Sequence, residues 1–433
     1  VLPNKTLNSW VFKGRGAAKE PRNATLITSA IALVFVLMGD VNAVAEVISM
    51  FFLVTYGSLC LISFLQHFAA DPAYRPSFRS KWFLSLMGAV LCIYLMFKIN
   101  MPYAIAALVV MMLLYAYITM KSATKQGMAS IFQGVIQQFN RQLQVYLQKA
   151  EKATTEEEWR PAVLCLSPAS FERYSALEMM RWISYRYGFG TYIHFEKDYF
   201  SKETRAQAKE NLDKLIKIAA ISHSNVFLET LISPSNTAAI IQAIQQPGIS
   251  GKPNNMMLFE YKRGEKEWLG DVIDNYSVLK TAQFDLCILG TSDKGFGYKR
   301  SIHIWIRKED YENANLMILM SYIILGHPEW KDGEITIYAI FREEVIEEEQ
   351  RNLVKLAVSG RLPISANNIH AIPMVEGSSR KDLINETSSS ADLTFIGIHE
   401  SMLDAEKNDE LFEGYDKVGN ILFVNPLTSK FIK

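Results

Sequence analysis

The sequence predicts a helical membrane segment followed by an α/β part that is built from two units. Three features of the chain lead to this prediction. Four long apolar stretches lie within residues 24–120, and only three acidic residues, Asp40, Glu46 and Asp71, accompany them. Beyond residue 121 the chain is mixed and charged, and short strand-like runs alternate with helix-like ones.

The change in composition near Met120 marks the main boundary. We expect a cytoplasmic N-terminal segment, four membrane helices, a connecting helix with its linker, and two α/β units, at residues 1–23, 24–120, 121–159, 160–263 and 264–433. The chain starts at Val1 rather than Met, and its first residues lack the apolar core of a signal peptide. We therefore expect a mature or truncated start.

The four apolar stretches are Ala24–Met38, Val41–Phe68, Trp82–Phe97 and Met101–Met120. A hydrocarbon core of about 30 Å needs about 20 helical residues, so the second and fourth are long enough and the other two need flanking residues. Core helices of a soluble bundle would show a polar face at helical spacing, whereas these stretches are apolar all round. The pattern favours four membrane spans.

The positions of Lys and Arg set the orientation of these spans. Basic residues gather in residues 1–23, in the loop at residues 70–81 and after the fourth stretch, while the two intervening turns carry only Lys98. Because basic segments stay on the cytoplasmic side, both ends of the segment are expected in the cytoplasm. Pro72 and Pro76 stiffen the basic loop between the second and third spans.

Polar residues inside the expected spans are few. Glu46 lies near the outer end of the second stretch, where solvated anchoring competes with a functional role for an intramembrane acid. The small residues Gly57, Gly88 and Ala89 permit close helix contact. These observations identify no ion site, and we expect no ion-binding residue in this chain.

Residues 121–159 are expected to connect the two parts. Gly127–Ala150 carries apolar residues at helical spacing, which predicts an amphipathic helix, and a polar linker follows it. The four cysteines, Cys60, Cys92, Cys165 and Cys287, have no metal-ligand spacing and suggest no disulfide framework. We expect them to be small buried residues in a reducing compartment.

Ten strand-like runs follow, interspersed with helices. The strands are expected at residues 162–167, 191–196, 225–232, 255–261, 284–290, 301–306, 334–341, 368–374, 392–398 and 420–424. The helices are expected at residues 171–187, 202–220, 233–246, 265–281, 314–325, 345–358 and 381–387, with Ser233 and Pro234 opening the third. This alternation predicts parallel sheets covered by helices on both faces, in two units that break near 261–265 and are candidates for a degenerate repeat.

Few residues in this part suggest chemistry. The glycine-rich stretch Gly290–Arg300 follows a strand, but a strand rather than a helix comes next, which favours a hairpin or flexible loop over a phosphate cradle. Ser167 and Ser170 stand at a strand-to-helix turn, where a helix cap is favoured over an anion site.

The histidines do not change this picture. His194 and His303 are expected to face the surface or to be satisfied polar residues, and His399-Glu400 lacks the second histidine of a zinc motif. We expect no enzyme activity, no cofactor and no metal site. With 45 basic and 45 acidic residues the net charge is +0, which excludes bulk attraction to nucleic acid.

Several stretches together resemble the cation-chloride cotransporter family. They are GRGAAKEPRNA, ISMFFLVTYGSLCLISF and the YRPSF loop at Tyr74–Phe78 in the apolar part, and IHIWI followed by ILMSYIILGHPEWKDGEITIYAI in the α/β part. The resemblance implies a leucine-transporter-like fold of twelve spans and a cytoplasmic domain related to universal stress proteins. This chain would supply the last four spans and that domain, with the ion sites on missing upstream spans.

The resemblance also implies how the chain works. It suggests a prokaryotic C-terminal portion of a secondary transporter that couples chloride to potassium, sodium or both. This chain would supply scaffold spans and a dimerising, regulatory cytoplasmic domain. Partners would be the lipid bilayer, the ions and a second copy of the chain, which is expected to meet it along Trp82–Met120 and Gly127–Ala150. An amino acid permease of the same superfamily and a membrane-anchored nucleotide sensor are the alternatives.

Overall fold

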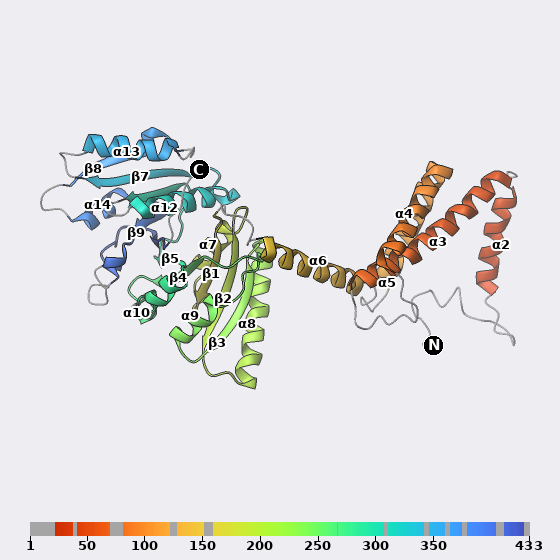
Figure 1. Cartoon of the computed structure of the whole chain (residues 1–433), viewed down its shortest axis with the longest axis horizontal. Helices are drawn as coiled ribbons and strands as arrows, with labels where there is room; N and C mark the ends of the chain where they lie inside the picture. Colours follow the sequence, from red (N-terminus) through yellow and green to blue (C-terminus); the bar gives the residue numbers. More distant parts are fainter. Residues whose placement is uncertain are drawn as a thin grey trace. The chain divides into compact units, whose positions relative to one another are not determined.

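The computed structural model of the 433-residue chain divides into two compact units, Val1–Tyr146 and Leu147–Lys433 (Figure 1). The structure describes residues 22–37, 41–69, 81–121, 128–150, 159–265, 267–306, 311–341, 346–359, 364–374, 379–403 and 411–427. The basic loop with the YRPSF motif lies outside the described residues except for Lys81.

The first unit is entirely helical in its described residues. Its helices are α2 (Arg22–Leu37), α3 (Val41–Ala69), α4 (Trp82–Ile99), α5 (Met101–Lys121) and α6 (Met128–Ala150). The first four coincide with the expected apolar stretches. Among the described residues only two helices, Val44–Ala69 and Trp82–Ile99, are long and apolar enough to cross a membrane, so the expected count of four spans is not confirmed.

Helices α3 and α4 pack against each other through reciprocal small residues. A Cβ added at Gly57 would lie 3.1 Å from Cys92 Cβ, and one added at Gly88 would lie 3.0 Å from Cys60 Sγ. The order of these pairs makes the two helices antiparallel. The expected close contact at the glycines is confirmed, and both cysteines are free thiols.

We predict that Gly88→Ala weakens the α3–α4 pair and that Cys60→Ala relieves the damage. The added methyl would press on Cys60 Sγ, and overpacking of this kind costs about 1–3 kcal/mol. The double variant should regain most of the loss, because the added Cβ lies 3.7 Å from Cys60 Cβ, an ordinary contact. Thermal unfolding in detergent measures this, with the exposed Val90→Leu as control; no recovery in the double variant would contradict the packing.

Helix α6 is amphipathic, as the sequence predicts. Its exposed apolar side chains are Phe132, Ile136, Phe139, Leu143, Val145 and Tyr146. All but Val145 lie along one side of the helix at spacings of three and four residues. The opposite side is rich in glutamine and carries Arg141.

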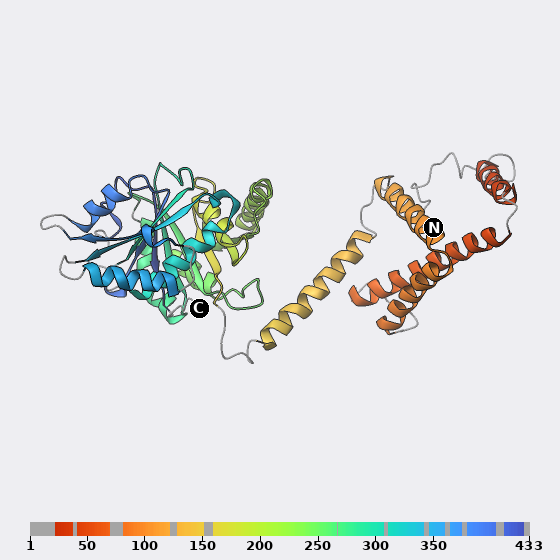
Figure 2. The same ribbon diagram turned by 90° about the horizontal axis from the view of Figure 1, so that it is seen from above.

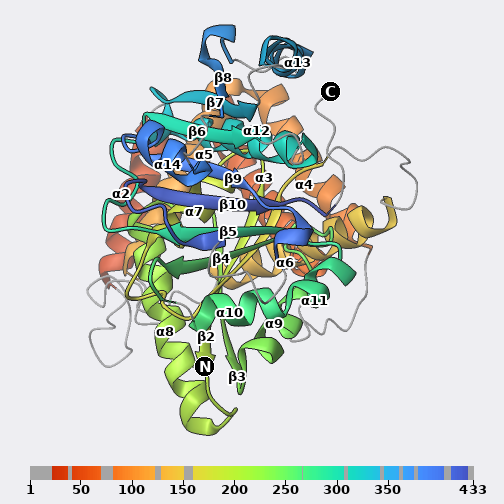
Figure 3. The same cartoon turned by 90° about the vertical axis from the view of Figure 1, so that its left-hand side faces the viewer.

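The second unit contains one ten-stranded sheet, in the order β3-β2-β1-β4-β5-β10-β9-β6-β7-β8. The strands are β1 (Ala162–Ser167), β2 (Phe189–Lys197), β3 (Phe227–Ser233), β4 (Met256–Lys262), β5 (Asp285–Thr291), β6 (Ser301–Ile306), β7 (Glu334–Phe341), β8 (Ile369–Pro373), β9 (Leu393–Gly397) and β10 (Asn420–Asn425). All ten expected strands are confirmed, and Figure 3 shows most of them one beside the next.

The sheet consists of two parallel halves joined by one antiparallel pair. Strands β1–β5 are parallel to their neighbours, as are β6–β10, and β5 pairs antiparallel with β10. Within each half the strands follow the order 3-2-1-4-5. The shared order supports the repeat suggested by the sequence.

The sequence predicted a break between the two α/β units near residues 261–265. In the structure the first half of the sheet continues beyond this point, through β5. Strand β5 is hydrogen-bonded parallel to β4 and therefore completes the first half. The segment beginning at Glu265 was expected to open a second unit. It holds α10 (Glu267–Asp274) and α11 (Tyr276–Thr281), which form the crossover between β4 and β5.

Helices cover both faces of the sheet, as expected (Figure 2). One face carries α7 (Ser175–Ile183), α8 (Lys202–Ile221), α12 (Tyr311–Leu325) and α13 (Ile346–Ser359). The other carries α9 (Asn236–Ile244), α10, α11 and α14 (Arg380–Thr387). Helix α9 is capped by Ser235, whose side chain accepts from Ala238 N, so the cap predicted at Ser233 and Pro234 was wrong: the observed cap residue lies two residues after Ser233.

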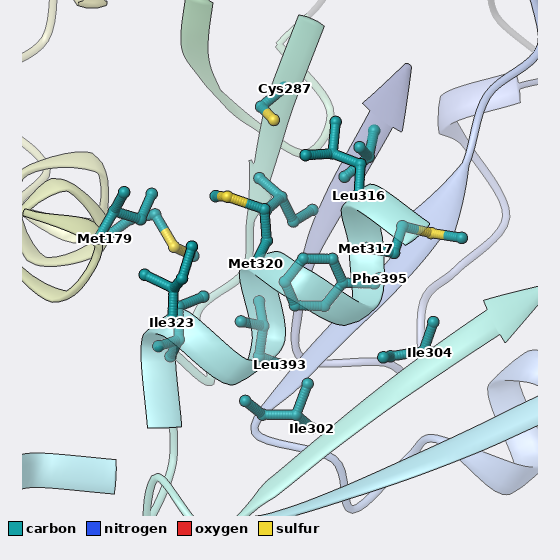
Figure 4. Close-up of a cluster of buried hydrophobic side chains, with 14 of the residues drawn as sticks. Met179, Cys287, Ile302, Ile304, Leu316, Met317, Met320, Ile323, Leu393 and Phe395 are labelled. Carbon is teal, nitrogen blue, oxygen red and sulfur yellow. The ribbon is translucent and has the colours of Figure 1, made fainter. Parts of the chain in front are cut away.

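Helix α12 forms the centre of one core. Its side chains Leu316, Met317 and Met320 belong to the same buried cluster as Phe395 of β9 and Ile304 of β6 (Figure 4). These residues are at most 1% exposed. Helix α12 is apolar on every side because the sheet and its neighbour α7 both pack against it, which explains its resemblance in composition to a membrane segment.

Candidate functional site

Two places in the sheet are candidates for binding. In open parallel sheets, ligands bind beyond the carboxyl ends of the strands where the strand order reverses. The first such point lies between β1 and β4, and the second between β6 and β9. The described residues at these two points differ in chemistry.

A row of polar side chains crosses the first point. Ser167 ends β1 opposite His194 of β2, and Glu260 of β4 follows the Leu166–Phe259 pair by one residue. Neighbouring residues in register project from the same face of a sheet, so the three side chains form one row. All three residues are buried.

The two serines hold the turn that follows β1. Ser167 Oγ accepts from the Ala169 amide at 3.3 Å, and Ser170 Oγ lies 2.9 Å from His194 Nδ1. The predicted helix cap was wrong, because α7 begins only at Ser175 and its N-cap residue, Tyr174, makes no side-chain bond to the helix. The serines instead satisfy the turn and the buried imidazole.

Both strand histidines are buried rather than facing the surface. His194 contacts Ser170, and His303 Nδ1 lies 2.9 Å from Ser388 Oγ, so the alternative of satisfied polar residues is confirmed. Burial lowers the pKa of His194 and lowers that of His303 to about 4. Both imidazoles are therefore neutral at physiological pH.

Glu260 is the most unusual group at the first point. It is 0% exposed, and neither carboxylate oxygen has a hydrogen-bond partner among the described residues. Burial raises its pKa to about 7, against the opposing effects of the Arg173 guanidinium and the Ala176 amide. The sequence analysis overlooked this residue, although an acid within the apolar run NMMLFEY was a signal.

We predict that Glu260→Gln stabilises the protein above neutral pH. The folded state raises the pKa from 4.5 to about 7 and so holds the proton more tightly than the unfolded state does. Stability is therefore lost as the pH rises through this range, and the loss stays complete above it. The difference corresponds to about 3 kcal/mol, which the glutamine variant should recover at alkaline pH and not at acid pH.

Thermal unfolding of the full chain in detergent across this pH range measures the effect. Glu172→Gln is the matched control, because Glu172 is an exposed glutamate, and it should change stability by less than about 0.5 kcal/mol. A Glu260→Gln variant that keeps the wild-type pH dependence would contradict the assignment.

The second point is a cavity with an apolar floor. This cavity, beside the carboxyl ends of β6 and β9, has a volume of about 370 Å³. Its lining residues are Trp305, Ile306, Ile340, Arg380, Lys381, Ile384, Ile396, Ser401, Met402, Leu411 and Tyr415. Two cations and no acid among these side chains suit an anion that carries an apolar group.

In the stretch after β5 that begins with the glycine-rich residues, the backbone amides bind the carboxylate of Asp392. Asp392 accepts from the backbone amides of Tyr298, Arg300 and Ser301 at 2.7–3.0 Å. A Cβ at Gly297 would lie 2.0 Å from Asp392 Oδ1, and its φ of +49° favours glycine. The predicted strand follows, and the carboxylate occupies the place that a phosphate would need.

The remaining candidates have structural partners. His399 Nδ1 lies 3.3 Å from the Ser401 amide, and Glu400 pairs with Lys280 at 2.5 Å. No group of three or more His, Cys, Asp or Glu residues suited to a metal occurs in the described part of the chain. In the first unit, Glu46 accepts from Asn100 Nδ2 at 2.7 Å and so ties α3 to the start of α5.

Comparison with known proteins adds a family match for the apolar part. Residues 2–152 match the family described as "Amino acid permease". The chain is 26% identical to "Potassium/chloride cotransporter 3" of Caenorhabditis elegans over 353 residues, which cover 76% of this chain and 32% of that protein. It is 22% identical to "Cation-chloride cotransporter 2" of Oryza sativa subsp. japonica, over 84% of this chain and 38% of that protein.

Two further similarities cover single parts. "Solute carrier family 12 member 2" of Homo sapiens is 39% identical over 111 residues, which are 25% of this chain and 9% of that protein. A solved structure described as the cytoplasmic domain of a prokaryotic cation chloride cotransporter superposes with a TM-score of 0.44 and 12% identity, over 62% of this chain and 96% of that one. The chain thus spans about a third of the first two relatives and about a tenth of the third.

Proposed function

Since this chain is a relative of the cation-chloride cotransporters, we propose that it is the C-terminal portion of a secondary transporter that couples chloride to potassium or sodium. The similarity to "Potassium/chloride cotransporter 3" carries the proposal, because it extends over 76% of the chain and therefore into both units. A permease-like apolar part alone would not account for it.

In this proposal the apolar part is a scaffold of four spans rather than the ion path. Ion sites in secondary transporters use interrupted helices and convergent polar groups near the middle of the membrane. Helices α3 and α4 are continuous, and their polar contacts include Ser63 with Ser85 and the Glu46–Asn100 bond near one end. The alternation of basic loops supports a cytoplasmic location for the α/β unit in this proposal.

Ion uptake by the complete transporter tests this proposal. Proteoliposomes with the full-length protein should take up rubidium, as a potassium substitute, or sodium when chloride is present. Replacing chloride by gluconate should reduce the initial rate by about tenfold or more, since coupling requires both ions. Liposomes without protein are the control. Cation uptake that is indifferent to chloride would contradict the coupling.

An amino acid permease is the second candidate, favoured by the match of residues 2–152 to the family of that description. The same proteoliposomes distinguish the two candidates. Saturable uptake of a labelled amino acid that does not depend on chloride would support the permease, whereas chloride-dependent cation uptake supports the cotransporter.

We propose that α6 contributes to a homodimer. Its exposed apolar stripe, Phe132, Ile136, Phe139, Leu143 and Tyr146, is of the kind that two copies bury against each other. Arginine at Ile136 and Phe139 should therefore shift the particle mass in detergent from dimer to monomer. The matched control is Gln148→Arg on the opposite side of the helix, which should leave the dimer intact. Light scattering measures both, and a dimer that survives the paired arginines would contradict the interface.

A nucleotide-sensing role for the α/β unit is favoured by the cavity beside β6 and β9. Its apolar floor could receive a base, and Arg380 and Lys381 could face phosphates. Calorimetric titration of the full chain in detergent with ATP tests this role. A saturable heat that Arg380→Ala weakens would support it, and no heat would contradict it.

A further inference from the structure

Arg173 lies between two carboxylates at the first switch point of the sheet. Its guanidinium donates to Glu265 Oε2 at 2.8 Å, in a pair whose arginine is 16% exposed and whose glutamate is 58% exposed. The same guanidinium acts on the buried Glu260, where it partly offsets the effect of burial on the carboxyl pKa. Arg173 thus interacts with an outer acid, the exposed Glu265, and an inner acid, the buried Glu260.

The inner acid has no other cation to balance it among the groups that face it. Cys165 of β1 and Tyr192 of β2 lie beside it, and burial raises the pKa of both, so they stay uncharged. His194, in the same row, is neutral near pH 7 because burial lowers its pKa. From α7 only the Ala176 amide faces the carboxyl, and Glu265 adds a negative charge. Arg173 is therefore the available counter-ion.

The structure shows the arrangement that suits a protonated Glu260. The carboxyl oxygens lack hydrogen-bond partners in the described surroundings, while Arg173 pairs with Glu265. An ionised carboxylate buried in this way is strongly unfavourable unless a cation pairs with it. Losing the proton should draw the guanidinium inward and strengthen the attraction between the carboxylate and the N-terminus of α7.

We propose that Arg173 exchanges between Glu265 and Glu260 according to whether Glu260 carries a proton, so that the turn between β1 and α7 responds to pH. Arg173 belongs to that turn, which begins at Ser167 and leads into α7 at Ser175. A change of partner by this one side chain therefore acts directly on the start of the helix. The inference concerns the α/β unit and stands independently of the transported ions.

Hydrogen–deuterium exchange of the full chain in detergent tests the proposal. After correction for intrinsic exchange rates, amides of residues 169–178 should become about tenfold more protected between about pH 5.5 and about pH 8.5, with a midpoint near 7. Glu260→Gln should remove the transition and keep the low-protection level at both pH values. Peptides from β9 serve as a reference for global unfolding and should not change.

Two control variants separate this mechanism from simpler ones. Glu265→Gln should keep the transition with a midpoint at lower pH, because the outer partner no longer competes for Arg173. His194→Gln should leave it unchanged. A transition that persists in Glu260→Gln, or that disappears in His194→Gln, would overturn the proposal. A pH-independent wild-type chain would overturn it as well.

Discussion

The antiparallel pairing of β5 with β10 is the constraint on which the second unit depends. Each half of the sheet, taken alone, would leave the edge of its fifth strand unpaired, and an open edge is a liability in solution. Joining the two fifth strands removes both edges at once. Because the pairing is antiparallel, the strands of the two halves run in opposite directions. The carboxyl ends of one half therefore lie beside the amino ends of the other. The polar row and the apolar cavity are therefore separated by the geometry of the joint itself.

The two halves share a topology but not a chemistry. Aligning Ala162 of β1 with Ser301 of β6 through their first register pairs places the row Glu260–Ser167–His194 on equivalents Gly397–Ile306–Ala339. Three polar residues in one half correspond to a glycine and two apolar residues in the other. The cavity of the second half lies mainly on the other face of the sheet, among Trp305, Ile340 and Ile396, whereas the row of the first half consists of side chains that need partners.

The ten strands could be predicted because each is a short apolar run between turn residues, a local signal. What depends on tertiary contacts could not. The segment after Glu265 reads as a new unit, and only its pairing partners show that it is a crossover. Ser167 and Ser170 are residue types that often cap a helix, but the side chain of Ser170 instead contacts His194, a buried residue of another strand. Asp392, distant in sequence from the glycine-rich loop that it closes, gave no local signal.

Burial affects the titratable groups of the α/β unit in different directions, and this decides which can respond near neutrality. Buried cysteines and tyrosines move to higher pKa and stay neutral, while His303 moves to about 4 and stays neutral as well. Glu260 is different, because burial raises the pKa of its carboxyl to about 7. A buried apolar residue in its place would avoid the cost of a charge without a partner. A carboxyl in this position, with an arginine beside it, is therefore better explained by a change of charge state than by stability.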